Sequence, residues 1–210
     1  MKYGIKRQDS YSRGELLLRG FFGAFYIALP HAFLLIFVML ASIFLNMIAF
    51  WAILITGKYP EGMFNFQVNA QRWGLRVSAR LLNLVDGYPA FGMTHQDDSV
   101  VIDIERPEKS NRLSVLARAM FGVFYVMIPH AFCLLFLQIG ANFVRIIAFW
   151  AILITGKYPK GMHSYMVGVM RWGFRVNAYM GYLTDTYPPF SMSGDEADFS
   201  GHGSKDLLDN

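Results

Sequence analysis

The sequence has few of the residues on which catalytic and metal sites depend. It contains one cysteine, Cys133, which excludes an internal disulfide and a cysteine-bound zinc or iron–sulfur centre. A glycine-rich phosphate loop, an HExxH motif, a serine elbow and paired carboxylates on one helix face are all missing. The sequence therefore predicts a protein that is not an enzyme and has no metal site.

Charge is also scarce, and it is unevenly distributed. Only 16% of the residues are charged, against 54% hydrophobic. Residues 21–55 carry no charged side chain, and Arg145 is the only one within residues 119–154. Each run exceeds the roughly 20 residues with which a helix crosses a bilayer. The first run is too long for a cleavable signal and recurs later, so we expect an integral membrane protein with both runs retained.

The chain contains an internal repeat. The residues AFWAILITGKYP at 49–60 return unchanged at 148–159, and other matches follow with the same offset of 99. The repeat predicts a duplication. The predicted segments are a polar basic N-terminus (1–18), a first membrane repeat (19–93), a hydrophilic linker (94–112), a second membrane repeat (113–192) and a disordered acidic tail (193–210). Within the linker, the alternation at 100–105 favours a short strand.

An amphipathic helix is predicted after the first apolar run, within residues 62–84. Asparagine and arginine recur there at spacings of three and four, which places them in one stripe. A cationic stripe on an apolar helix is typical of a helix lying on an anionic membrane surface. The expected fold is an all-α integral membrane protein with two parallel repeats, each a long Pro-kinked or hairpin apolar segment followed by an amphipathic Arg/Trp helix.

The flanking charges constrain the topology. Both repeats have basic residues before and after the apolar run, so the positive-inside rule favours all repeat ends and the linker in the cytoplasm. Each repeat would then cross the membrane an even number of times. The run itself would form a hairpin, or the Arg helix would be the return crossing. We expect the hairpin, because Arg72 and Arg76 at mid-membrane would cost about 2.5 to 3.5 kcal/mol each.

Several side chains are candidates for binding. The stripe arginines, with two neighbouring tryptophans, are predicted to grip lipid phosphates, or else to serve as a topological anchor without a specific ligand. This set is Arg72, Arg76, Arg80, Arg171, Arg175, Trp73 and Trp172. Interfacial anchors are predicted at Lys58, Tyr59, Lys157 and Tyr158.

Polar residues inside the apolar runs form a second candidate set. His31 and His130 follow prolines at equivalent positions and are expected to hydrogen-bond a neighbouring helix; haem ligation by this pair is the less favoured alternative. Arg145 replaces Asn46 of the first repeat and would line a polar path, snorkel to the interface or pack against a partner subunit. No other cofactor is expected. Asp86 and Asp185, before Tyr-Pro turns, are expected to cap or to form ion pairs.

Each repeat resembles a known family. The string WAILITGKYP, then Gly62-Met63-Phe64, then Arg72-Trp73 and Arg76, then Asp86 and Tyr88-Pro89 is similar to the bacterial membrane family called domain of unknown function 4389. Asp185-Thr-Tyr-Pro-Pro-Phe190 resembles the closing motif of that family closely, whereas Ala90 replaces its second proline in the first repeat. The resemblance implies a modular unit in a bacterial inner (cytoplasmic) membrane and no particular activity.

The expected function is that of a non-enzymatic accessory or scaffold subunit in contact with anionic lipid. The expected partners are membrane lipids together with other membrane subunits or a second copy of the chain, and not nucleic acid. A transporter or channel component for an anionic solute or lipid is the alternative, and a haem-binding redox subunit is the third hypothesis.

Overall fold

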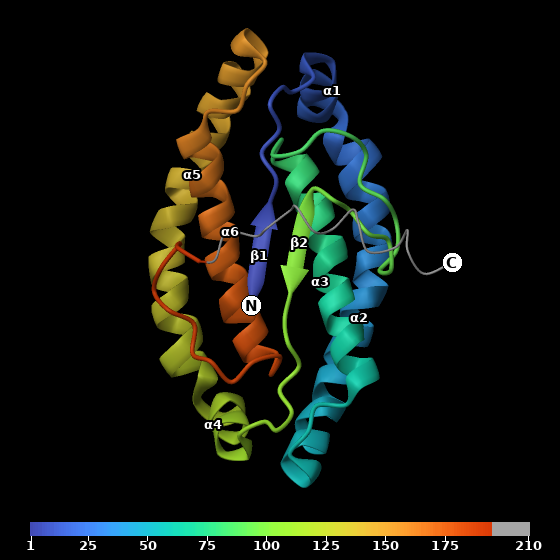
Figure 1. Ribbon diagram of the computed structural model, residues 1–210, viewed down its shortest axis with the longest axis vertical. Helices are drawn as coiled ribbons and strands as arrows, with labels where there is room; N and C mark the ends of the chain where they lie inside the picture. The colour runs from blue at the N-terminus through green and yellow to red at the C-terminus, as the bar shows by residue number, and fades with distance from the viewer. Residues whose placement is uncertain (195–210) are drawn as a thin grey trace, which may run out of the picture.

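A computed structural model describes residues 1–194 of the chain (Figure 1). The fold is mostly helical, as the sequence predicts. The predicted disordered tail falls, from residue 195 onward, outside the described residues.

The first apolar run forms one continuous helix of 44 residues. It comprises α1 (Arg13–Gly23), the π-helical segment η1 (Ala24–Ala28) and α2 (Leu29–Thr56). Gly57 ends it in the left-handed conformation at φ 75°, which glycine adopts without steric cost. The expected long apolar helix is therefore confirmed, whereas a hairpin within the run is wrong. The return is made by α3 (Glu61–Leu81), which packs back along α2 (Figure 1).

Pro30 does not break this helix, because its local cost is met by a distant side chain. Proline has no N–H, so the carbonyl four residues earlier, that of Tyr26, loses its helical donor. The Tyr88 hydroxyl donates to that carbonyl at 3.0 Å. The wider turn of η1 lies immediately before the proline. In the second half the Tyr187 hydroxyl donates to the Tyr125 carbonyl at the same distance.

The second half contains the same elements. They are α4 (Arg112–Gly122), η2 (Val123–Met127), α5 (Ile128–Thr155) and α6 (Lys160–Met180). Each begins and ends 99 residues after its counterpart. Polar side chains start both long helices: Ser12 accepts from the Glu15 amide and Asn111 from the Ser114 amide.

A two-stranded antiparallel sheet joins the halves. Strand β1 (Lys2–Ile5) pairs with β2 (Val100–Asp103), and Tyr3 lies opposite Ile102. These two residues are also 99 apart, so an approximate two-fold axis through this pair relates one half to the other. Strand β2 lies in the predicted position. Strand β1 is not predicted by the sequence, because four residues of a basic N-terminus carry little periodic signal.

The two long helices run antiparallel, and the ends of one meet the ends of the other. The Arg13 guanidinium donates to the Ile154 carbonyl at 2.8 Å, and the Arg112 guanidinium donates to the Ile55 carbonyl at 3.0 Å. The two copies of AFWAILITGKYP therefore lie at opposite ends of the long axis (Figure 1).

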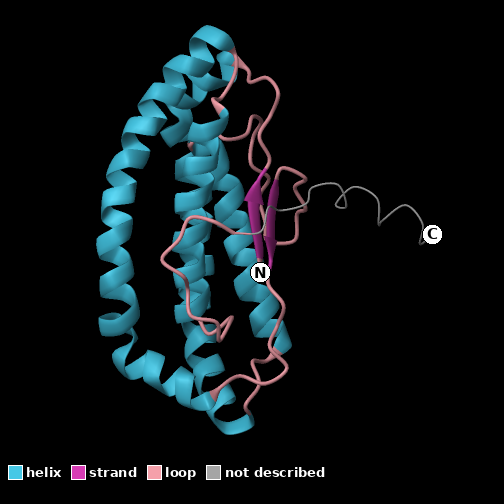
Figure 2. Cartoon of the chain, turned by 60° about the vertical axis from the view of Figure 1, so that its left-hand side comes forward, coloured by secondary structure: helices cyan, strands magenta, loops and turns pink. Residues whose placement is uncertain are grey.

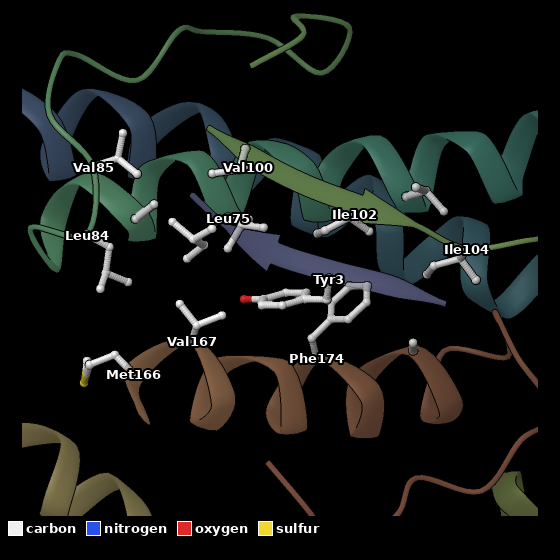
Figure 3. Packing of buried hydrophobic residues seen from close by; sticks show 14 of the residues in the cluster. Tyr3, Leu75, Leu84, Val85, Val100, Ile102, Ile104, Met166, Val167 and Phe174 are labelled. Atoms are coloured by element: carbon white, nitrogen blue, oxygen red, sulfur yellow. The ribbon is translucent and has the colours of Figure 1, made fainter. Parts of the chain in front are cut away.

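The molecule has an apolar helical side and a polar side. Figure 2 shows the strands and most loops on the side opposite the curved long helices. Helix α3 packs on both α2 and β2, while α6 packs on α5 and β1, so the shorter helices form the middle layer. Figure 3 shows the core where α3, α6 and the sheet meet. There the Tyr3 ring lies 5.0 Å from that of Phe174 and close to Leu75 and Ile102.

Candidate membrane-contacting surface

The first long helix exposes a continuous apolar face. Large apolar side chains recur along it at helical spacing, and no other part of residues 1–194 covers them. Those most exposed are Phe21, Phe22, Phe25, Leu29, Phe33, Ile36, Phe37, Met39, Ile43, Phe44, Met47, Trp51 and Ile55.

The second long helix exposes the equivalent face. The set includes Met120, Phe121, Phe124, Ile128, Phe132, Leu135, Phe136, Phe143, Ile146, Ile147, Trp150 and Ile154. We call the two faces together the apolar surface. Monomeric soluble proteins rarely expose a contiguous apolar patch beyond a few hundred Å².

Both helices are long and apolar enough to span a membrane. They are not the buried core helices of a soluble protein: only 6% of the most apolar window of the first helix, and 17% of that of the second, is buried. The sequence prediction of two long apolar helices is confirmed, and their exposure gives them a lipid-compatible surface.

The repeated motif divides its residues between surface and core. Lys58 and Lys157 are exposed, as interfacial anchors must be. Tyr59 and Tyr158 are not: they are 0% and 1% exposed, and Tyr59 packs edge-on against Phe64. The anchor prediction is therefore wrong for both tyrosines, whose rings point into the core.

Trp51 and Trp150, which the sequence analysis missed, occupy the surface instead. They are 59% and 56% exposed. The signal was their place within the motif, four residues before Ile55 and Ile154, which puts each tryptophan on the exposed face of its helix. Tryptophan is favoured at membrane interfaces.

The arginine stripe of α3 faces the polar layer. The Arg72 guanidinium donates to the Ile102 carbonyl of β2 at 3.0 Å, and Arg76 donates to the carbonyls of His95 and Gly92. Arg80 pairs with Asp97 at 2.7 Å. Burial lowers the pKa of the Arg76 guanidinium, and the Asp97 charge opposes this shift.

The stripe of α6 is used in the same way. Arg171 donates to the Tyr3 carbonyl of β1 at 3.1 Å and to the Met192 carbonyl, while Arg175 donates to the Ser191 carbonyl. The arginines of both stripes therefore fasten the sheet and loops to the middle helices.

These contacts decide part of the lipid-phosphate prediction. Arg76 is 1% exposed and Arg80 is buried, so neither guanidinium reaches a phosphate outside the fold. Trp73 and Trp172 are buried as well. The prediction is wrong for these four residues, because a protein layer rather than lipid covers the stripe. For the half-buried Arg72, Arg171 and Arg175 it stays a prediction.

Each histidine of the two long helices lies inside an aromatic cluster. The Trp73 indole N–H donates to His31 Nδ1 at 3.0 Å, and the Phe91 ring stacks on the imidazole at 4.0 Å. In the second half the Trp172 indole N–H donates to His130 Nδ1 at 2.9 Å, and the Phe190 ring stacks on the imidazole with ring centres 3.9 Å apart. The expected hydrogen bond between helices is confirmed, since each tryptophan lies on the shorter helix. Because Nδ1 accepts, the proton of each neutral imidazole is on Nε2.

The other predicted intramembrane residues differ in exposure. Arg145 lies exposed on α5, and within residues 1–194 it has no ion pair or side-chain hydrogen bond. Its counterpart Asn46 is half-buried, and the Oδ1 atom of that side chain has no partner among the described residues.

Asp86 and Asp185 form the expected ion pairs. Asp86 accepts from Arg19 at 2.6 Å and from the Ser12 amide at 2.7 Å. Asp185 accepts from Arg118 at 2.5 Å and from the Asn111 amide. Arg19 and Arg118, the two buried arginines at the centres of these networks, were not among the predicted site residues. They are the last charges before each apolar run, which was the available signal.

The second half of the chain matches a known protein family. Residues 113–192, which run from α4 past the end of α6, match the model of a family described as "Domain of unknown function (DUF4389)". No curated protein and no solved structure matches the chain. The matched segment contains the Pro129-His130, Arg171-Trp172 and Tyr187-Pro188 positions whose contacts are described above. The predicted resemblance to the DUF4389 family is therefore confirmed for residues 113–192.

Proposed function

We propose that the protein is a non-enzymatic scaffold or accessory protein of the bacterial inner membrane, embedded by its apolar surface in the cytoplasmic leaflet. In this arrangement both long helices lie in the plane of the membrane and the sheet faces the cytoplasm. The single observation that supports it most is the placement of a two-stranded sheet, with an open backbone edge on each strand, halfway along two exposed apolar helices.

The length of the helices argues against a perpendicular crossing. A helix of 44 residues is about 66 Å long at 1.5 Å per residue, about twice the roughly 30 Å of the hydrocarbon core. The exposed apolar face extends from Phe21 to Ile55 without a polar interruption. A helix lying in the plane of the leaflet keeps all of this face in lipid.

The sheet gives the stronger argument. Both strands of a two-stranded sheet have an open edge, and unpaired backbone groups are not tolerated in hydrocarbon. If the long helices stood upright, β1 and β2 would lie near the bilayer midplane, with Lys2 and Asp103 exposed there (Figure 2). In the in-plane arrangement the same sheet faces water.

The charge of the two ends agrees with this arrangement. Exposed Lys58 and Arg112 lie at one end of the molecule, and exposed Arg13 and Lys157 lie at the other. An upright molecule would place these ends on opposite sides of the membrane, against the positive-inside rule. Lying flat, it presents both ends to the same anionic head groups, where each cation contributes about 1 kcal/mol.

The repeated architecture suggests how such a scaffold arose. The halves share their element order and their aromatic clusters, which supports a tandem duplication of the family unit. The approximate two-fold axis would then be the membrane normal, so that the repeats are parallel with respect to the membrane.

A depth measurement tests the proposal. Single cysteines at Phe25, Phe37 and Ile55, in a Cys133→Ser background, would carry spin labels in liposomes of phosphatidylglycerol and phosphatidylethanolamine. The in-plane arrangement gives three similar, shallow depths. An upright helix gives a depth that passes through a maximum at the bilayer centre, which would overturn the proposal.

A second measurement separates a scaffold from the transporter alternative. Proteoliposomes loaded with an anionic fluorophore are expected to leak no faster than protein-free liposomes loaded in the same way. A protein confined to one leaflet has no continuous path across the bilayer. A leak that Arg145→Leu abolishes would favour the transporter.

A further inference from the structure

A cavity of about 630 Å³ lies near the two-fold axis, between the middle helices. Tyr3 and Ile102 of the sheet are at its inner end, α3 and α6 form its walls, and α2 flanks it. Met39 and Ile43 of α2 also line it, and both belong to the apolar surface. The cavity therefore extends from the inner face of the sheet to the surface that we propose to lie in lipid.

Small side chains keep this space open. Gly74 and Gly173 line the cavity, and a Cβ atom added at either would meet nothing within 4 Å. Ser78 and Asn177 follow one turn later on the same two helices. Protein interiors are normally filled to a density close to that of organic crystals, so an opening of this size between helices is unusual.

The lining is apolar with uncharged polar groups. It contains no Asp, Glu, Lys, Arg or His. Asn46 contributes an Oδ1 atom that has no partner in the described chain. Within the same residues, no side-chain hydrogen bond joins Gln71 or Asn177 to a neighbour. A buried amide oxygen without a donor is costly and is normally satisfied.

We propose that this cavity binds a single-chain membrane lipid whose head group is uncharged and hydrogen-bonding. The chain lies between Met39, Ile43 and the walls of α3 and α6, and a hydroxyl of the head donates to Asn46 Oδ1 once the side chain of this lining residue turns toward the cavity. At about 30 Å³ per water-sized group, the cavity holds about 20 heavy atoms, which is the size of one long acyl chain with a small head. An anionic head is disfavoured because the lining offers no cation.

The assignment of a lipid to this cavity rests on the proposed function, because that function places the cavity in a membrane. The binding test itself does not depend on the proposed function. The full chain, purified in a mild detergent and stripped of lipid, is titrated with monooleoylglycerol and observed by native mass spectrometry. We expect saturable binding of one molecule per chain. Oleate, which has the same chain and a charged head, is expected to bind at least tenfold more weakly.

Cavity-filling variants provide the decisive comparison. Gly74→Leu and Gly173→Leu add a side chain into open space and replace glycine in a helix, so both are expected to fold and to melt no lower than the wild type. Either is expected to weaken monooleoylglycerol binding at least tenfold. Gly62→Leu is the matched control: its added Cβ also meets nothing, but Gly62 lies outside the cavity, so binding is unchanged.

The polar contact is tested separately. Asn46→Leu is expected to reduce the preference for monooleoylglycerol over oleate at least threefold, and Arg145→Leu to leave it unchanged. Binding by Gly74→Leu and Gly173→Leu equal to that of the wild type would overturn the cavity assignment, and equal or tighter binding of oleate would overturn the uncharged head. Flotation with liposomes reports independently on membrane attachment: Gly74→Leu should float as the wild type does, so a failure there affects the proposed function alone.

Discussion

The two halves of the chain share their elements, but their sequences differ at many positions. Both halves keep the arginine that pairs with an aspartate before the Tyr-Pro turn, the histidine–tryptophan pair and the tyrosine that caps the carbonyl freed by proline. They differ where Arg80 becomes Tyr179, Phe64 becomes His163 and Asn46 becomes Arg145. The shared contacts hold the long helix to its shorter neighbour and to the closing loop.

One difference changes how the buried arginine is stabilised. In the first half Arg19 binds Asp86, Glu15 and Asn83. In the second half Arg118 lacks a counterpart of Glu15; it donates to the carbonyls of Tyr179 and Thr184, and its guanidinium lies 4.4 Å from the centre of the Tyr179 ring. Both halves have an arginine at this position because the closing loop is held to the long helix there. Either set of partners provides that contact.

The largest expected effect comes from removing these arginines. Arg19→Met and Arg118→Met each remove a buried guanidinium with its hydrogen bonds and leave a half-buried carboxylate without its cation, which is expected to lower the free energy of unfolding by about 3 to 4 kcal/mol. Arg118→Met should be the worse of the two, because two backbone carbonyls also lose their donor. Denaturation in detergent micelles measures both.

Arg145→Met is the matched control for this pair. Arg145 is exposed and has no partner in residues 1–194, so the change is expected to stay within about 0.5 kcal/mol. If Arg118→Met were as stable as this control, the Arg118 network would not hold the second half together.

A smaller effect, confined to acid pH, is expected from His163. Burial, and next the charge of Arg7, lowers the pKa of this imidazole to about 4. The unfolded chain, with a pKa near 6.5, binds the proton first as pH falls. Stability is therefore complete above about pH 6.5 and decreases towards pH 4, by at most about 3 kcal/mol.

The first half provides the matched substitution. Phe64 packs against Tyr59 as His163 packs against Tyr158, with ring centres 5.6 and 5.5 Å apart. His163→Phe should reduce the loss between pH 6.5 and pH 4 and have little effect at pH 8. An unchanged pH profile of the melting temperature would show that another group causes the acid sensitivity.

The smallest effect is expected from the tyrosine caps. Tyr88→Phe and Tyr187→Phe each delete one hydroxyl donor to a proline-freed carbonyl, at a cost of about 1 kcal/mol. The two losses should be equal, since both distances are 3.0 Å. Tyr182→Phe is the control, because its hydroxyl has no hydrogen bond to the described chain. Unequal losses would show that the two π-helical segments are not equivalent.

The sequence predicts the elements better than it predicts their surroundings. Hydrophobic run length and helical spacing locate the long helices, α3 and α6, and the repeat locates their counterparts. Spacing places Arg72 and Arg76 on one face of α3, but it does not say which layer covers that face. The cover is a sheet whose strands are about 100 residues apart in the chain, so only tertiary structure shows that the stripe binds protein.

The same limit explains the other errors. Tyr59 follows Lys58 in the repeated motif and is a residue type expected at a membrane interface, yet after the turn at Gly57 its ring lies in the core. Pro30 predicts a helix boundary or kink from local chemistry alone, and the Tyr88 hydroxyl that lets the helix continue through it comes from a distant loop.

Labelling from each side of the membrane tests the central claim most directly, because it shows on which side each copy of AFWAILITGKYP lies. Single cysteines at Lys58, Lys157 and Asp98, in a Cys133→Ser background, would be labelled with a membrane-impermeant maleimide in inside-out and in right-side-out vesicles. Embedding in one leaflet predicts that all three react from the cytoplasmic side only. Reaction of Lys58→Cys and Lys157→Cys from opposite sides would mean that the long helices cross the membrane, and would contradict the account.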